Sequence, residues 1–136
     1  MNQREKAIQM KLDKAKALMT EVEYHLQNDF FTTAVSRLYY SCFHATKALL
    51  LTKDIAPKTH SGAAHLLHQH FVKQNLFDTN HATFFSILMN KRIDSDYSDF
   101  MISNREEILK LIEPAKQYLE YVIGLISTIQ TDNTSL

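Results

Sequence analysis

The chain has 136 residues, enough for one small domain, and 45% of them are hydrophobic, which is too many for a disordered chain. Fifteen Lys and Arg balance fifteen Asp and Glu, which argues against a protein that relies on nonspecific contacts to phosphates. The single cysteine, Cys42, excludes an internal disulfide, and two Gly with two Pro are few for β-hairpins. No apolar run approaches the ~20 residues that span a bilayer, and charge alternates too often near residue 1 for a signal peptide. We therefore expect a cytoplasmic helical domain that makes no membrane contact.

Apolar residues recur every three or four positions along most of the chain, which predicts helices. The first is expected at about 3–28 and the second at about 31–53. A loop containing Pro57 separates them from a third helix at about 61–74. The fourth follows Asp78 or Thr79, either of which can cap it, and ends near residues 92–97.

The fifth helix is expected to begin at Ser103, because Ser103 and Glu106 have the spacing of a capping box. Pro114 lies inside its apolar pattern and predicts a kink or a restart. We expect residues 128–136 to form a frayed tail, so that one domain spans residues 1–127. The sum predicts an all-α fold, an up-and-down bundle of about five helices.

The second predicted helix is apolar or aromatic nearly all round. One face carries core residues, and the stripe facing away from them contains Arg37, Tyr40, Ser41, His44, Ala48 and Leu51. Such a helix is usually covered on both sides. A second subunit can supply that cover, so the stripe is a candidate dimer face.

Four groups of residues have a chemical interpretation beside a structural one. Arg37 and His44 are two helical turns apart, so the imidazole can do acid–base work on a phosphodiester while the guanidinium stabilises the developing phosphate charge. The alternative is an interface helix whose polar groups are hydrogen-bonded. Tyr40, next to Tyr39, can stack on a base, whereas Tyr39 and Phe43 fit a core position.

The run from Lys91 to Asp99 combines two cations, three acids and a tyrosine. Arg92 can bind a phosphate with both arms of its guanidinium. Asp94, Asp96 and Asp99 can hold a hard cation, although the Gly and Glu of a calcium-binding loop are missing. The alternative is a salt-bridged helix end.

Five histidines gather in the middle of the chain, and they are His60, His65, His68, His70 and His81. Two of them one turn apart can share a metal, but the ligand set is smaller than that of transition-metal sites. A solvated helix face is the alternative. We expect neither a metal nor a cofactor.

Three segments together resemble HEPN-domain proteins of the small, stand-alone prokaryotic branch. They are AVSRLYYSCFHATKALL at residues 34–50, PKTHSG at residues 57–62 and RIDSDY at residues 92–97, and the resemblance covers about residues 5–127. It implies a five-helix bundle that forms a homodimer, often beside a minimal nucleotidyltransferase in a toxin–antitoxin pair. Active HEPN toxins are metal-independent ribonucleases with an Arg and a His separated by four to six residues. In some pairs the transferase adds AMP to a tyrosine near that motif.

At the position that resembles the motif, Arg92 is followed after four residues by Tyr97 in place of histidine. Tyrosine, with a pKa of about 10, is a poor general acid–base group near neutral pH. The resemblance therefore implies a HEPN component that binds nucleotide or RNA with a degenerate motif. Its expected binding residues are Arg37, Tyr40, Lys91, Arg92 and Tyr97, with Tyr97 as the AMP acceptor.

Two alternatives stay open. The first is an active metal-independent ribonuclease that uses Arg37, His44 and Arg92, since Arg37 and His44 have six residues between them. The second is a non-catalytic helical dimer that serves as a scaffold.

Overall fold

The computed structural model describes residues 1–97 and 104–134, apart from the side chains of 94–97 and 133–134. This part of the chain contains the helices α1 (Gln3–Gln27), α2 (Phe31–Leu51), α3 (His60–Leu67), α4 (Thr79–Tyr97) and α5 (Arg105–Thr134), and a π-helical turn, η1 (His68–Val72). The predicted all-α bundle of five helices is confirmed. No helix in the described ranges is both long and apolar enough to cross a bilayer.

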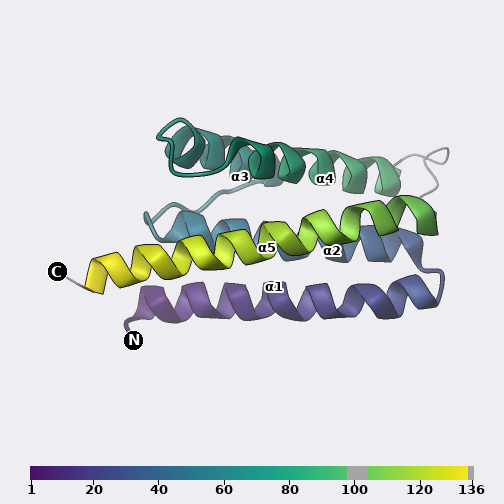
Figure 1. The fold of residues 1–136 in the computed structure, drawn as a ribbon, viewed down its shortest axis with the longest axis horizontal. Helices are drawn as coiled ribbons and strands as arrows, with labels where there is room; N and C mark the ends of the chain where they lie inside the picture. Colours follow the sequence, from purple (N-terminus) through teal and green to yellow (C-terminus); the bar gives the residue numbers. More distant parts are fainter. Residues whose placement is uncertain (98–103, 135–136) are drawn as a thin grey trace.

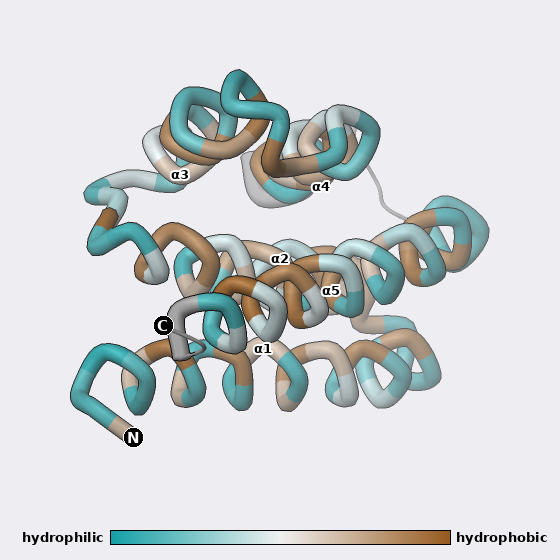
Figure 2. Tube along the Cα trace, turned by 60° about the vertical axis from the view of Figure 1, so that its left-hand side comes forward, coloured by the Kyte–Doolittle hydropathy of each residue, from teal (hydrophilic) through white to brown (hydrophobic). Residues whose placement is uncertain are grey.

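The helices form three levels with α2 in the centre (Figure 1). α1 and α2 form an antiparallel hairpin, α5 lies along α2, and α3 with α4 form the third level on the other side. Figure 2 shows hydrophobic stretches of α2 and α5 between α1 and the α3–α4 level. Because α2 contacts α1, α3, α4 and α5, its residues are presented to nearly every other element.

Asp and Asn residues end three of the helical segments where glycine is more common. Asp29, Asp54 and Asn75 have φ values of 60°, 58° and 59°, in the left-handed region. After α1, the Phe30 N–H donates to the His25 carbonyl at 2.8 Å, as in a Schellman motif. Short polar side chains tolerate this conformation, which explains how a chain with two Gly ends its helices sharply.

The outer stripe of α2 is covered in part by the chain itself. Ser41 and Ala48 are fully buried, and the Ser41 hydroxyl donates to the Ala15 carbonyl of α1 at 2.7 Å. Tyr40 and His44 remain half-buried. The second cover expected from another subunit is therefore supplied at Ser41 by α1, which packs against α2 along the hairpin.

The start of α5 differs from the expected capping box. Asn104 is the cap, and its side-chain oxygen accepts the Glu107 N–H at 2.9 Å. Ser103 lies outside the described residues. An Asn satisfies an unpaired N–H of the first turn as well as a Ser does, so the helix begins one residue later than expected.

α5 is one helix to its end. It passes through Pro114 without a restart, and the segment expected as a tail from Thr128 is helical up to Thr134. Within it, the Thr128 hydroxyl donates to the Gly124 carbonyl one turn earlier, at 3.1 Å. Gly124 itself is helical, so neither it nor Thr128 ends the helix.

Candidate functional site

The aromatic residues of α2 form one side of a small cluster that is completed by His60, the first residue of α3. His60 Nδ1 lies 2.9 Å from the hydroxyl oxygen of Tyr39. Its ring centroid is 4.5 Å from that of Phe43 and 5.6 Å from that of Tyr40. Thr59 caps α3 by accepting the Gly62 N–H at 2.9 Å, which fixes the helix start and with it the position of His60.

Arg92 of α4 joins the same cluster. Its guanidinium carbon lies 5.4 Å from the Tyr40 ring centroid and 5.9 Å from that of Tyr39, within the range of cation–π attraction. Burial lowers the pKa of His60, and the positive charges of Arg92 and Lys47 lower it further. Arg92 therefore lies close enough to His60 for its positive charge to disfavour protonation of the imidazole.

His44, one turn after Tyr40 on α2, forms the other end of the cluster. Its ring centroid is 6.3 Å from that of Tyr40. Burial lowers the pKa of His44 to about 4, and Lys14, Lys47, Lys11 and His60 contribute in the same direction. The imidazole is therefore neutral at pH 7.

This arrangement suits an anionic ligand. It combines a guanidinium, two neutral imidazoles and a half-buried phenol within the reach of one phosphate and one base. A neutral imidazole can donate a hydrogen bond through one ring nitrogen and accept one at the other, and a guanidinium stabilises charge that develops on phosphate oxygens. An accessible aromatic ring beside cations is also a usual platform for single-stranded nucleic acid, and Tyr40 is the one of Tyr39, Tyr40 and Phe43 that is not buried.

Arg37 is not part of this cluster. Its Nε donates to a carboxylate oxygen of Glu21 on α1 at 2.8 Å. Arg37 lies two turns, about 10 Å, before His44 along α2. The structure thus brings His44 and Arg92 to one group of rings, while the Arg37 side chain is engaged by a different helix.

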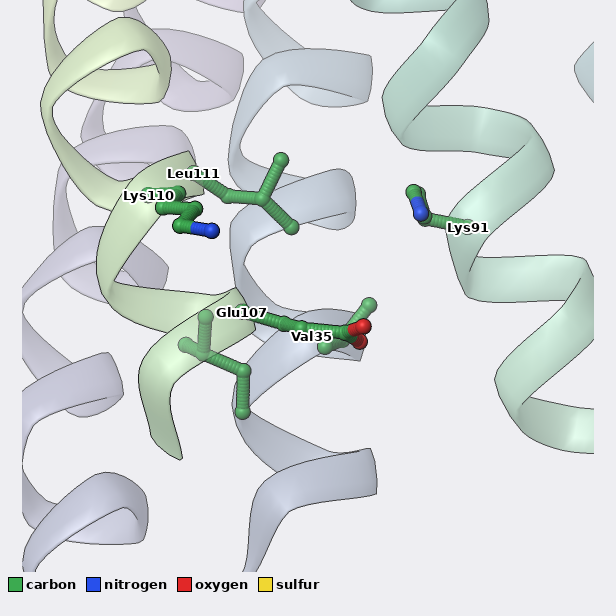
Figure 3. Close-up of a pocket in the computed structure, with 6 residues that line it drawn as sticks. Val35, Lys91, Glu107, Lys110 and Leu111 are labelled. Atoms are coloured by element: carbon green, nitrogen blue, oxygen red, sulfur yellow. The ribbon is translucent and has the colours of Figure 1, made fainter. Parts of the chain in front are cut away.

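Lys91 faces another part of the molecule, a pocket between α2, α4 and α5 (Figure 3). The pocket has a volume of about 240 Å³ and is lined by Val35, Lys91, Glu107, Ile108, Lys110 and Leu111. Successive residues of a helix point about 100° apart, which separates Lys91 from its neighbour Arg92. Lys91 therefore belongs to this pocket.

Some of the expected site residues cannot be placed. Tyr97 is the last residue of α4, and its side chain lies outside the described residues. The same holds for the side chains of Asp94 and Asp96, and for the whole of Asp99.

The remaining histidines divide among several environments. His65 and His68 are exposed, as a solvated helix face requires, whereas His81 stacks on Tyr121 with 4.5 Å between centroids. Within the described ranges, no three His, Cys, Asp or Glu side chains gather as metal ligands do. His60 departs from the solvated interpretation, because the start of α3 packs against α2.

Sequence reasoning placed His60 among the candidate metal-binding histidines and not beside α2. It did not single out three lysines near His44, which are Lys11, Lys14 and Lys47. The PKTHSG segment contained His60, but its loop-like composition gave no sign of a contact with α2. No sequence pattern singled out these lysines, since the pairing of α1 with α2 that gathers them is a tertiary contact.

Comparison with known proteins adds an independent line of evidence. A sequence profile of the HEPN domain matches residues 8–125. Putative toxin MJ0142 of Methanocaldococcus jannaschii is 34% identical over 128 residues, which cover 90% of this chain and 87% of that protein. The UPF0332 protein of Thermotoga maritima is 27% identical over 130 residues, or 96% of this chain and 98% of the relative. Putative toxin MJ0605 of Methanocaldococcus jannaschii is 28% identical over 115 residues, or 85% of each chain.

Proposed function

The chain belongs to the HEPN-domain family, and on this premise we propose that it is the HEPN component of a toxin–antitoxin-type pair that binds RNA or a nucleotide. Two relatives that carry the word toxin in their names cover most of the chain, which supports the toxin-like part of the proposal. The observation that carries the binding part is the position of Arg92 over the rings of Tyr39 and Tyr40, beside His60.

A phosphate is the ligand group that this geometry favours. A guanidinium binds phosphate oxygens through its N–H edges, whereas contact with aromatic rings uses its flat face. Tyr40 is half-buried, so part of its ring is available to a base. His44 and His60 are neutral at pH 7 and add no repulsion among the cations.

The proposal includes a homodimer and a minimal nucleotidyltransferase as partners. The family resemblance supports both, since HEPN proteins of this branch pair with such transferases. Tyr97 is the proposed acceptor, on whose hydroxyl oxygen the transferase would place the AMP of ATP, with release of pyrophosphate. Mass spectrometry of the chain purified together with a transferase encoded beside it tests this step, and an unmodified Tyr97 after incubation with ATP contradicts it.

Titration of a fluorescein-labelled oligoribonucleotide, followed by fluorescence anisotropy, tests the binding site. We expect Arg92→Ala to weaken binding strongly and Arg92→Lys to weaken it less, because lysine keeps the charge and loses the fork. Arg37→Ala is the comparison variant, and its effect is expected to be small because Arg37 is held by Glu21. Equal binding by wild type and Arg92→Ala would contradict the site.

A second candidate function is metal-independent cleavage of RNA. The observation in its favour is that His44 and His60 lie near the same rings, with centroids 5.6 Å and 4.5 Å from that of Phe43. When an RNA 2′-hydroxyl attacks the neighbouring phosphate, the reaction requires a base, an acid and a group that stabilises phosphate charge. Two imidazoles and a guanidinium can fill these roles. In EDTA, cleavage to 2′,3′-cyclic phosphate ends that is lost in His44→Gln would establish this function, and intact RNA would exclude it for the protein alone.

A further inference from the structure

The positive charge of the cluster continues past His44 onto α1. Lys47 lies one turn after Phe43 on α2, with its Nζ 5.1 Å from the centroid of that ring. Burial lowers the pKa of Lys47, and so do the charges of Lys11 and Lys14 on α1. Lys11 and Lys14 are three residues apart and therefore share a helix face. Three ammonium groups are thus held close enough to repel one another.

Two carboxylates close to these lysines in sequence have other hydrogen-bond partners. Asp13 accepts a hydrogen bond from Gln9 at 2.8 Å, and Asp54 is paired with Arg4 at 2.8 Å. The groups that act on Lys47 and His44 are all lysines or histidine. A cluster of this kind is stabilised by a bound anion.

An apolar groove opens beside these lysines. It has a volume of about 380 Å³ and is lined by Ala7, Lys11, Lys47, Leu51, Ile55, Ala56 and Pro57. The groove lies between α1, the end of α2 and the loop that follows it. Apolar walls with charged groups at one edge are typical of sites that take a flat ring joined to a polar group.

We propose that Lys11, Lys14 and Lys47, with the groove behind them, bind one nucleoside phosphate unit of a single-stranded RNA whose chain continues over Tyr40 to Arg92. The inference rests on the proposed function and extends it. Lys47 and Tyr40 are seven residues apart on α2, about 10 Å along the helix. Lys47, Phe43, His60 and Arg92 form a continuous series of contacts and charge interactions between the two ends.

RNA fits this track better than an acidic peptide. Lys47 of α2 lies over the ring of Phe43, and Arg92 of α4 lies over the half-buried ring of Tyr40. Cations beside an accessible aromatic ring can bind phosphates while the ring stacks on a base. Carboxylate side chains would use the lysines and leave the rings and the groove unused. Competition by poly-glutamate therefore serves as an arm of the test.

The test compares a labelled ribonucleotide hexamer with a dinucleotide in anisotropy titrations at several salt concentrations. The variant Lys11→Ala/Lys14→Ala is matched by Lys6→Ala/Lys16→Ala, a pair of exposed lysines on the same helix. We expect the first pair to weaken hexamer binding and to lower its salt slope by roughly 1.4, since each single-strand phosphate contact contributes about 0.7. Dinucleotide binding, which needs only the Arg92 end, should change little.

A second variant tests the groove. Ala56→Trp places a large side chain at an exposed position on its wall. We expect weaker binding of the hexamer and unchanged binding of an abasic hexamer, because only the former has a base to place there.

The outcomes separate this inference from the proposed function. Hexamer binding that responds to the lysine pair and not to Arg92→Ala overturns the Arg92 cluster and the continuous path, and the reverse result overturns the lysine site. If poly-glutamate competes for the site as well as RNA does, binding is charge attraction alone and the inference is contradicted. The same conclusion follows if Lys6→Ala/Lys16→Ala weakens hexamer binding as much as Lys11→Ala/Lys14→Ala does. If free ADP binds tightly through the lysines and the hexamer binds no more tightly than ADP, the continuous path is contradicted. If the wild-type protein does not bind the hexamer, both proposals are overturned.

Discussion

The Nδ1 of His60 lies 2.9 Å from the hydroxyl oxygen of Tyr39, which links the first residue of α3 to a fully buried ring of α2. Burial is the largest cause that raises the pKa of Tyr39, so its hydroxyl keeps its proton near neutral pH. Because burial and positive charge keep His60 neutral, the hydroxyl can donate to Nδ1 in the tautomer that carries its proton on Nε2. The Nε2–H is then the donor that His60 offers to a ligand.

Tyr39→Phe should remove this hydrogen bond with little change in packing. We expect the free energy of unfolding to fall by about 1 kcal/mol, since one buried hydrogen bond is lost. The pKa of His60 should rise toward its ordinary value, because the proton donor that favoured the neutral form is gone. Urea denaturation and NMR titration measure the two effects. Tyr24→Phe, at an exposed tyrosine of α1, is the control and should change neither.

Acid should destabilise the protein through His44. Its folded pKa is about 4 and its unfolded value is about 6.5, so the unfolded state binds the proton more readily. The stability that comes from neutral His44 is complete above pH 6.5 or so and is lost as the pH falls from there through the folded pKa. In His44→Gln the unfolding free energy should depend less on pH across this window. His65→Gln, at an exposed site, should behave as wild type, and an unchanged profile in His44→Gln would contradict the pKa.

The effect on stability of substituting Asn75, in the turn that follows η1, should depend on the backbone conformation at this position. Its φ of 59° lies in the left-handed region, which glycine adopts freely, asparagine tolerates and β-branched residues strongly disfavour. Asn75→Gly should therefore preserve or raise the melting temperature, and Asn75→Val should lower the stability by about 1–2 kcal/mol. A melting temperature of Asn75→Val equal to that of wild type would show that the left-handed conformation is not required.

The proposed dimer can be tested at the half-buried Tyr40. A glutamate there should dissociate the dimer if the outer stripe of α2 is an interface, because a buried unpaired charge is costly. Tyr24→Glu, at a tyrosine of α1 that is 61% exposed, is the matched control and should remain dimeric. Ala48 does not serve this purpose, since it is buried within the chain itself. Sedimentation velocity of the two variants decides the question, and a Tyr40→Glu protein that sediments as the wild-type dimer would place the interface elsewhere.

Helical periodicity alone predicted the bundle, because a buried stripe repeats every three or four residues whatever covers it. The same reasoning could not tell which element covers each face of α2. Ser41 was assigned to a stripe that a second subunit would cover, yet its hydroxyl donates a hydrogen bond to the Ala15 carbonyl of α1. Periodicity defines the faces of a helix, and only tertiary packing assigns their partners.

The candidate site was predictable only in part for the same reason. Arg92 and Tyr40 were identified from residue type and motif, and the guanidinium carbon of Arg92 lies 5.4 Å from the ring centroid of Tyr40. His60 was grouped with the other histidines as a candidate metal ligand, because its contact with Tyr39 depends on the way α3 packs against α2. Arg37 was favoured by its spacing from His44, but Glu21 of α1, which no spacing on α2 reveals, holds its side chain.

The most direct test of the central claim is to follow the histidine side chains by NMR while a short oligoribonucleotide is added, and to repeat the measurement over a series of pH values. The account predicts that the imidazole signals of His44 and His60 shift, and that their pKa values rise as phosphate approaches, while the exposed His65 and His68 stay unchanged. Assignment by His44→Gln and His60→Gln identifies the signals. Saturable binding that moves only His65 or His68, or leaves all four in place, would contradict an RNA site at Arg92, Tyr40 and His60.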